Sequence, residues 1–186
     1  MALILASASP RRKELLRFIT EDFSVRVSDV DEHTDPNLTP EEAVVTLAKI
    51  KGEAVSENYP DDTIISADTV VVLNDKILGK PHSPEEAFSM LSSLSGNTHT
   101  VYTGVYIISE NKKIGFYDKT EVTFYTLSGD EINNYIKTGE PFDKAGAYGI
   151  QGLGAILIKG ISGDYYNVMG LPVAKLARTL KENDLL

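Results

Sequence analysis

The chain contains no cysteine among its 186 residues. This absence excludes disulfide bonds and zinc sites built from thiolates, and it suits a reducing compartment. No apolar run is long enough to cross a membrane, and the short run at residues 2–6 lacks the preceding basic segment of a secretory signal. We therefore expect a cytoplasmic protein that makes no contact with a membrane.

Basic residues are in the minority. Lysine and arginine number 18 against 27 aspartates and glutamates, which gives a net charge of −9. A protein that binds along duplex nucleic acid needs an excess of lysine and arginine on one face. We therefore expect no stable complex with nucleic acid, and a local cluster of basic residues near the N-terminus stands out against the acidic remainder.

Several common catalytic motifs are also missing. The sequence lacks the phosphate loop G-x-x-x-x-G-K-[ST], the zinc motif H-E-x-x-H and the nucleophile elbow G-x-S-x-G. Its three histidines, His33, His82 and His99, share no metal-ligand spacing, and we expect them at the surface or in loops. The chemistry must therefore lie in other patterns.

Helical and strand-like segments alternate along the chain. Capping boxes, in which Ser or Thr is followed three residues later by Glu, predict helix starts at Thr39, Ser83 and Ser128, and a last helix follows Pro172. Strand-like runs occupy residues 2–6, 23–27, 63–73, 98–108, 114–127 and 155–161. Because no linker or repeat interrupts this order, we predict an α/β fold over residues 1–186, a single domain with a mixed, bent sheet and flanking helices.

The densest basic cluster is SASPRRK, which follows the first apolar run. Ser9 stands where a helix N-cap belongs, and Pro10 suits the first turn. Free N–H groups at a helix N-terminus attract anions, so Arg11 and Arg12 beside them form a candidate phosphate-binding site. The alternative is an ordinary capped helix whose arginines are solvated.

Asp68 lies in the middle of an apolar run, residues 64–73. An ionised carboxylate is costly to bury unless it meets a cation, a metal or hydrogen-bond donors. One interpretation is a general base or metal ligand at the rim of a sheet. The other is a structural aspartate at a strand end or bulge.

Two further segments can contact a ligand. Lys80, between Gly79 and Pro81, can meet an anion, or it can be part of an ordinary polar turn. The segment 143–152 (DKAGAYGIQG) is rich in glycine, which lets the backbone approach a ligand closely, although it does not match the dinucleotide motif G-x-G-x-x-G. Gln151 within it can pair with the edge of a base through its amide, or it can be a solvated residue of a flexible loop.

Taken in order, the segments SASPRR, SADTVV, GKP, DKAGAYGIQG and GDYYNVMGLP resemble the Maf family of nucleoside-triphosphate pyrophosphatases. The five segments span nearly the whole chain with the spacing of that family. The resemblance implies a fold related to inosine-triphosphate pyrophosphatases, with two lobes around a cleft. It also implies metal-dependent hydrolysis of a nucleoside triphosphate to the monophosphate and pyrophosphate, a role that keeps non-standard nucleotides out of nucleic acids.

The resemblance also implies roles for individual residues. Asp68 matches the catalytic carboxylate that accepts a proton from the attacking water, and Asp68 with Glu32 would hold a divalent cation, Mg²⁺ or Mn²⁺. The residues that would bind the phosphates carry hydroxyl or cationic side chains: Ser7, Ser9, Arg11, Arg12, Lys51, Lys80 and Lys144.

Base selection would depend on Arg11, Thr69 and Gln151. The neutral amide of Gln151 suits the donor–acceptor edge of uracil or thymine, which favours dTTP, UTP and modified pyrimidine nucleotides. In the branch of the family that prefers 7-methyl-GTP, the resemblance implies an acidic residue at this position. The alternatives are therefore a 7-methyl-GTP pyrophosphatase and, from another class, a regulator of septum formation that binds nucleic acid. A homodimer is left open.

Overall fold

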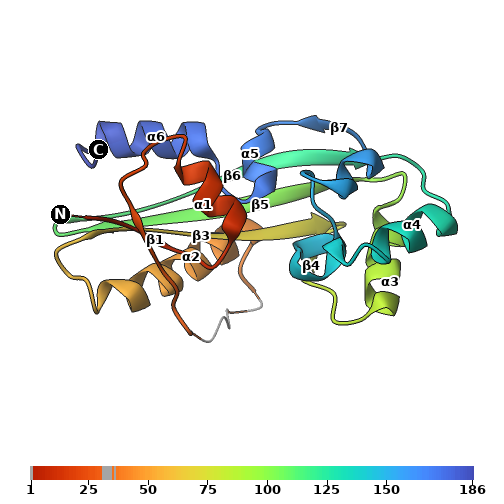
Figure 1. Cartoon of the computed structure of the whole chain (residues 1–186), viewed down its shortest axis with the longest axis horizontal. Coiled ribbons are helices and arrows are strands. Elements are labelled where there is room, and N and C mark those ends of the chain that lie inside the picture. Colours follow the sequence, from red (N-terminus) through yellow and green to blue (C-terminus); the bar gives the residue numbers. More distant parts are fainter. Residues whose placement is uncertain (1, 31–34, 36) are drawn as a thin grey trace. The chain divides into compact units, whose positions relative to one another are not determined.

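The computed structural model describes residues 2–30, 35 and 37–186 (Figure 1). Its strands are β1 (Leu3–Ala6), β2 (Ser24–Arg26), β3 (Thr63–Leu73), β4 (Lys76–Leu78), β5 (Thr98–Ser109), β6 (Lys112–Phe124) and β7 (Ile158–Ser162). They form one sheet in the order β2-β1-β3-β5-β6-β7, with β4 paired to β3. β1 runs parallel to β2 and β3, whereas β4 and β7 are antiparallel to their partners. The predicted mixed sheet is confirmed.

The helices are α1 (Pro10–Leu16), α2 (Pro40–Ser56), α3 (Pro84–Leu94), α4 (Gly129–Ile136), α5 (Tyr165–Met169) and α6 (Val173–Glu182), with short 3-10 helices η1 (Glu140–Asp143), η2 (Ala145–Ala147) and η3 (Leu153–Leu157). Five of these helices begin where the sequence signals predict, and α5 and the short 3-10 helices were not predicted. Thr39 and Ser128 form complete capping boxes, and the Ser83 hydroxyl accepts a hydrogen bond from the third residue of α3. In the described residues no helix has the length and apolar character needed to span a bilayer.

The chain divides into two compact units. Unit 1 comprises the described residues of 1–69, 103–118 and 170–186, and unit 2 comprises residues 70–102 and 119–169. Strands β3, β5 and β6 contribute residues to both units. Each unit has a buried apolar cluster of its own. Unit 1 contains a cluster of Ile4, Ala6, Val55, Ile64 and Ile108, and a larger cluster in unit 2 includes Val71, Leu91, Leu94, Val101, Val122, Phe124 and Leu157.

The strand predicted at residues 155–161 begins later than expected. Residues 153–157 form η3, and β7 begins at Ile158. Gly152 precedes η3 with φ +87° and ψ −147°, a conformation that glycine adopts most readily. This backbone turn, followed by a hydrogen bond from the Ala155 N–H to the Gly152 carbonyl, delays the extended segment.

The predicted position of His99 was wrong. His99 lies in β5 with only 2% of its surface exposed, and its Nε2 is 2.7 Å from the Tyr148 hydroxyl. The rings of His99, Phe124 and Tyr148 also pack edge to face. Burial lowers the pKa of His99 to about 4, so the imidazole is neutral in the core. His82 is exposed, as predicted, and His33 lies outside the described residues.

Candidate active site

The candidate site of unit 1 is built around Asp68. This residue lies in the interior of β3, not at a strand end, and it is buried. Lys51 of α2 donates a hydrogen bond from Nζ to Asp68 Oδ1 at 2.6 Å, and the two side chains are only 15% and 12% exposed. The carboxylate therefore has the cationic partner that its burial requires.

Close packing of α2 against β3 places Lys51 next to the carboxylate. A Cβ atom on Gly52 would lie 2.6 Å from Ser66 Oγ, so only glycine permits this approach of helix and strand. The Ser66 hydroxyl also donates to the Ala48 carbonyl of α2 at 2.6 Å. Ala48 lies about one turn before Lys51, and Gly52 directly follows it. These two contacts therefore hold α2 against β3 on both sides of Lys51, and they set the position of the ion pair.

The junction SASPRR forms the predicted helix cap. The Ser9 side chain accepts a hydrogen bond from the Arg12 N–H, and Pro10 occupies the first turn of α1. The Ser9 N–H donates to the Ser7 hydroxyl at 3.2 Å, and Ser7 is buried. Arg11 is half-buried on the same short helix.

Arg12 is held by hydrogen bonds rather than solvated. Its Nε donates to the Gly170 carbonyl at 2.8 Å, its Nη2 to the Thr69 hydroxyl at 2.9 Å, and its Nη1 to the Ser7 hydroxyl at 3.4 Å. The Thr69 hydroxyl is in turn 2.9 Å from the hydroxyl of the buried Thr103. The alternative of solvated arginines is therefore wrong for Arg12, which joins α1 to β3 and to the turn before α6.

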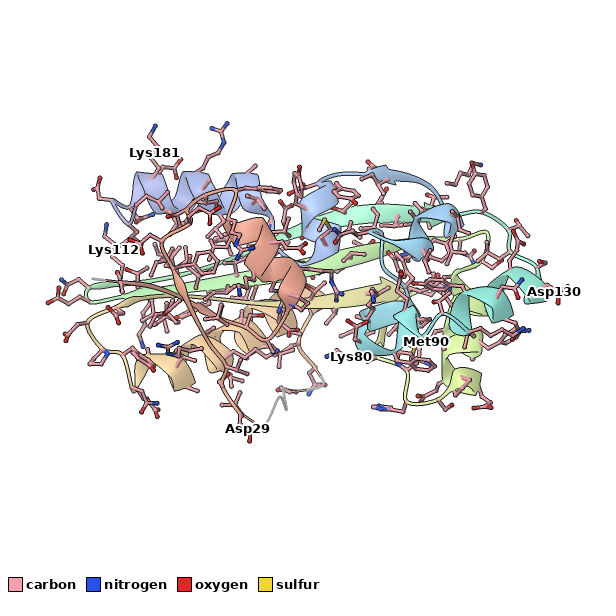
Figure 2. All side chains as sticks on the ribbon, viewed as in Figure 1. Asp29, Lys80, Met90, Lys112, Asp130 and Lys181 are labelled. Atoms are coloured by element: carbon pink, nitrogen blue, oxygen red, sulfur yellow. The ribbon has the colours of Figure 1, made fainter. Side chains whose placement is uncertain are left out.

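The predicted residues of unit 2 lie in irregular segments. Lys80 is exposed (Figure 2), and the turn that contains it is joined to the 143–152 segment by a hydrogen bond from the Gly146 N–H to the Gly79 carbonyl. Lys144 is 11% exposed, and its Nζ donates to Asp143 Oδ1 at 2.6 Å and to the Glu140 carbonyl at 2.7 Å. Gln151 is exposed. The GKP turn and the glycine-rich segment are thus brought together.

The metal prediction concerns Asp68 and Glu32. Glu32 lies outside the described residues. Within the described part of the chain there is no cluster of three or more acidic or histidine side chains that could hold a metal ion. The side-chain contacts of Asp68 there involve Oδ1 alone, so the carboxylate retains a second oxygen of the kind that Mg²⁺ and Mn²⁺ prefer.

Sequence reasoning missed two kinds of site residue. Thr103 lies on an alternating strand and gave no signal, because its contact with Thr69 joins residues 34 positions apart. Glu140 and Tyr135 also gave none, although they accept three hydrogen bonds from the backbone around Gln151 and share one with each other. Such contacts become visible only when the chain is folded.

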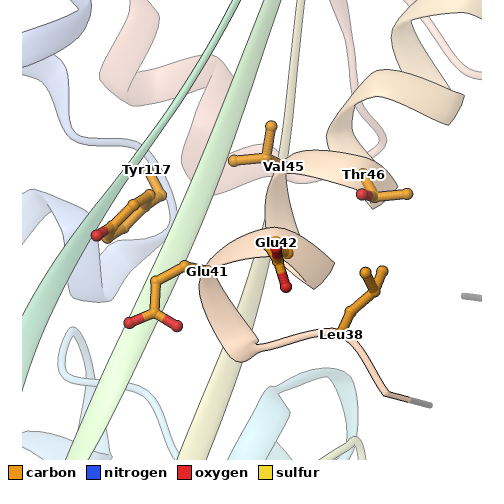
Figure 3. Close-up of a pocket in the computed structure, with 6 residues that line it drawn as sticks. All are labelled: Leu38, Glu41, Glu42, Val45, Thr46 and Tyr117. Carbon is orange, nitrogen blue, oxygen red and sulfur yellow. The ribbon is translucent and has the colours of Figure 1, made fainter. Parts of the chain in front are cut away.

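A separate open pocket in unit 1 has a volume of about 390 Å³ (Figure 3). It is lined by Leu38, Glu41, Glu42, Val45, Thr46 and Tyr117. None of the predicted site residues is among them, and the Glu42 carboxylate is already bound to the Thr39 N–H and hydroxyl as a helix cap. We therefore base the candidate site on the residues around Asp68 and not on this pocket.

A comparison of the sequence with models of protein families identifies the family to which the chain belongs. The model described as "Maf-like protein" matches residues 2–183. The chain belongs to the Maf family. The match includes Asp68, Lys51 and Arg12 in unit 1 and Lys80, Lys144 and Gln151 in unit 2, so the predicted resemblance is confirmed over nearly the whole chain.

Curated members of the Maf family are similar throughout their length. A protein of Bacillus cereus named "dTTP/UTP pyrophosphatase" is 51% identical over 183 residues, which cover 98% of this chain and 96% of that protein. Proteins with the same name from Bacillus mycoides and Bacillus cytotoxicus are 50% and 51% identical, with 98% and 97% of this chain covered and 95% of each relative.

Solved structures with the same fold are more distant. The Ham1 protein of Staphylococcus aureus aligns with a TM-score of 0.57 at 14% identity, over 97% of this chain and 98% of that one. A HAM1 protein from Coxiella burnetii gives 0.54 at 13% identity, with the same coverage. At this level of identity the likeness concerns the fold alone, and it confirms the predicted α/β fold class.

Proposed function

We propose that this member of the Maf family hydrolyses nucleoside triphosphates, with dTTP and UTP preferred, to the monophosphate and pyrophosphate. The observation that carries the proposal is identity of about half over nearly the full length to relatives named for that activity. In a cell this reaction would keep non-standard nucleotides, modified pyrimidine nucleotides included, out of nucleic acids.

Asp68 is the proposed general base. Its carboxylate would accept a proton from water while the water oxygen bonds to the α-phosphorus, and the bond from that phosphorus to the bridging oxygen breaks to release pyrophosphate. The ion pair with Lys51 supports this role, because it fixes the carboxylate in a buried strand and balances its charge. The proposed phosphate-binding residues are Ser7, Ser9, Arg11, Arg12, Lys51, Lys80 and Lys144.

A divalent cation, Mg²⁺ or Mn²⁺, would when bound stabilise the charge that develops on the phosphate oxygens. Asp68 is the described residue that fits as a ligand, since within the described residues its side-chain contact with Lys51 uses Oδ1 and leaves Oδ2 for a cation. Glu32 is the proposed second ligand. Hard oxygen donors of this kind suit both ions.

Gln151, Thr69 and Arg11 are the proposed selectors of the base. The exposure of Gln151 supports this role, because an exposed amide can meet a nucleotide. Its donor and acceptor would pair with N3–H and O4 of uracil or thymine, whereas a carboxylate could only accept. Thr69 contributes through the hydrogen bond that orders Arg12.

The remaining parts of the proposal concern the setting of the enzyme. Residues 1–186 would act as one functional domain in the cytoplasm. The nucleotide would be the partner, with or without a second copy of the chain as a homodimer. We propose no stable complex with nucleic acid and no contact with a membrane.

The test is a pyrophosphate-release screen with purified protein in Mg²⁺ or Mn²⁺ on dTTP, UTP, GTP and 7-methyl-GTP. We expect the highest kcat/KM with dTTP and UTP, and no release after chelation of the metal. Preference for 7-methyl-GTP would correct the substrate and leave the reaction standing. Absence of release from every nucleotide, together with salt-dependent DNA binding, would overturn the proposal in favour of a nucleic-acid-binding regulator.

A further inference from the structure

The Glu140 carboxylate binds the backbone on one side of Gln151. Its Oε2 accepts a hydrogen bond from the Leu153 N–H at 3.0 Å, and its Oε1 accepts one from the Gly154 N–H at 3.1 Å. Glu140 lies at the start of η1, thirteen residues before Leu153 in sequence. One side chain therefore holds two successive amides that follow Gln151.

Tyr135 extends this hold to the other side of Gln151. Its hydroxyl donates to Glu140 Oε1 at 2.9 Å and accepts a hydrogen bond from the Gly149 N–H at 3.2 Å. The backbone is thus bound at Gly149 and again at residues 153–154, with Ile150 buried and Gln151 exposed between the two attachments. We call this arrangement of Glu140 and Tyr135 the 149–154 clamp.

Two glycines permit the segment to lie this close to the 149–154 clamp. A Cβ on Gly152 would stand 2.8 Å from Glu140 Oε2, and the φ of +87° there already disfavours any other residue. A Cβ on Gly154 would stand 2.8 Å from the Tyr135 hydroxyl and 2.3 Å from the Gly149 carbonyl. Glycine at these two positions therefore allows the backbone to approach the Glu140 carboxylate and the Tyr135 hydroxyl closely.

The protonation states suit these hydrogen bonds. Burial alone would raise the pKa of Glu140, but the N–H groups of Leu153 and Gly154 and the Tyr135 hydroxyl outweigh it and lower that pKa. Burial raises the pKa of Tyr135, so its hydroxyl keeps the proton that it donates. An ionised carboxylate accepts stronger hydrogen bonds than a neutral group.

We infer that Glu140, acting through its carboxylate and Tyr135, is a positioning residue that fixes the 149–154 segment and so presents Gln151 to the base. This inference rests on the proposed function, in which Gln151 selects pyrimidines. Fixing the segment in advance means that little of the binding free energy is lost in ordering it when the nucleotide arrives. Glu140 itself need touch no substrate.

The test uses two variants and a matched control in the full chain. Glu140→Gln replaces one acceptor oxygen with an NH₂ group, so in either orientation at least one of the two amides loses its partner. Tyr135→Phe keeps the aromatic ring and removes the hydroxyl. The control is Glu131→Gln, because Glu131 is also a carboxylate that accepts backbone and hydroxyl hydrogen bonds in unit 2, but it caps α4 at Ser128.

The first readout is amide hydrogen exchange, which needs no activity. We expect Tyr135→Phe to accelerate exchange at Gly149, Glu140→Gln to accelerate it at Leu153 or Gly154, and Glu131→Gln to change neither. Unchanged protection at all three amides in both variants would overturn the clamp itself.

The second readout is the ratio of kcat/KM on dTTP to kcat/KM on GTP. We expect it to fall about five- to tenfold in Glu140→Gln and in Tyr135→Phe, the effect of loosening one hydrogen-bonding group, and to be unchanged in the control. A ratio that stays at the wild-type value while the exchange changes would overturn the link from the clamp to selection, with the proposed function intact. A wild type without pyrophosphate release would overturn that function instead.

Discussion

The two units differ in how they hold a carboxylate with a proposed functional role. In unit 1 the Asp68 carboxylate forms an ion pair with Lys51, made between a long helix and a long strand. In unit 2 the Glu140 carboxylate binds the backbone of an irregular segment, and the buried pair of His99 with Tyr148 is neutral. The difference follows from whether the backbone of each segment satisfies its own hydrogen-bonding groups.

Regular elements can fix a charge at a defined position, because helix and strand already satisfy their own backbone groups. An irregular segment leaves backbone N–H groups that must find other acceptors, and in unit 2 the Glu140 carboxylate accepts hydrogen bonds from those of Leu153 and Gly154. Asp68 and Lys51, the pair at the centre of the proposed chemistry, thus lie on a strand and a helix, whereas Gln151, one of the three residues proposed for selection, lies on a segment that side chains hold in place.

The largest effect is expected from Asp68→Asn, which removes the proposed base and metal ligand from unit 1. Loss of one well-placed acid–base group lowers turnover by roughly 10²–10⁴-fold, so pyrophosphate release should nearly disappear. The change also leaves the Lys51 ammonium without its carboxylate, so circular dichroism and an unfolding curve are measured alongside. Near wild-type turnover in a folded variant would make Asp68 a structural residue.

Lys51→Met tests whether unit 1 depends on a buried charge pair. Removing one partner of such a pair costs about 3–5 kcal/mol when the other is fully buried, and we expect about 2–3 kcal/mol here because both side chains retain some exposure. The double variant Lys51→Met/Asp68→Asn should recover part of this loss in urea unfolding.

The control for that experiment is Lys113→Met, because Lys113 pairs with Glu53 at 3.0 Å on the surface of the same unit, with side chains 59% and 38% exposed. Exposed pairs contribute about 0–1 kcal/mol to the free energy of unfolding, so this variant should be close to wild type. Equal losses in the two variants would contradict the contrast between buried and exposed pairs.

A pH titration tests the neutral pair of unit 2. Burial lowers the pKa of His99 from 6.5 to about 4, so between these values the unfolded chain binds a proton that the folded chain does not. The free energy of unfolding is therefore undiminished above pH 6.5 and falls as the pH drops toward 4, by up to about 1.4 kcal/mol per pH unit. His99→Gln should remove this slope, and His82→Gln, at an exposed position, should keep it.

Most of the longer helices and strands were predictable because their signals are local, whereas the short β4 and α5 were not predicted. A capping serine or threonine and its glutamate lie three residues apart, and the apolar run around Asp68 predicts a buried strand without knowledge of its neighbours. The same run indicates that Asp68 needs a partner, but it does not name Lys51, which lies 17 residues away and reaches the carboxylate through the approach that Gly52 permits.

The parts that the sequence did not predict depend on contacts between distant residues. His99 lies in an alternating strand, whose sequence is compatible with an exposed or a buried position for this side chain. The packing of Phe124 and Tyr148 against His99 shows that it is buried. The 149–154 clamp likewise requires the turn at Gly152, which brings the chain next to the Glu140 side chain of η1. The resemblance to a family implied roles for individual residues of this chain, but it implied none of these contacts.

The smallest effect is expected from Thr103→Val, which sharpens the comparison within unit 1. Thr103 is fully buried, and its hydroxyl, 2.9 Å from that of Thr69, supports the side chain that accepts the Arg12 Nη2 hydrogen bond. Valine keeps the shape and removes the hydroxyl, so one hydrogen bond is lost at a cost of about 1 kcal/mol in the free energy of unfolding. If Thr69 orders Arg12, KM for the triphosphate should also rise several-fold with little change in kcat, because a less ordered guanidinium weakens binding before chemistry.

Thr123→Val is the matched control, since its hydroxyl pairs with that of Thr98 at 2.8 Å in unit 2, at an exposed position. A rise in KM of the same size in that variant would separate Thr103 from the phosphate site.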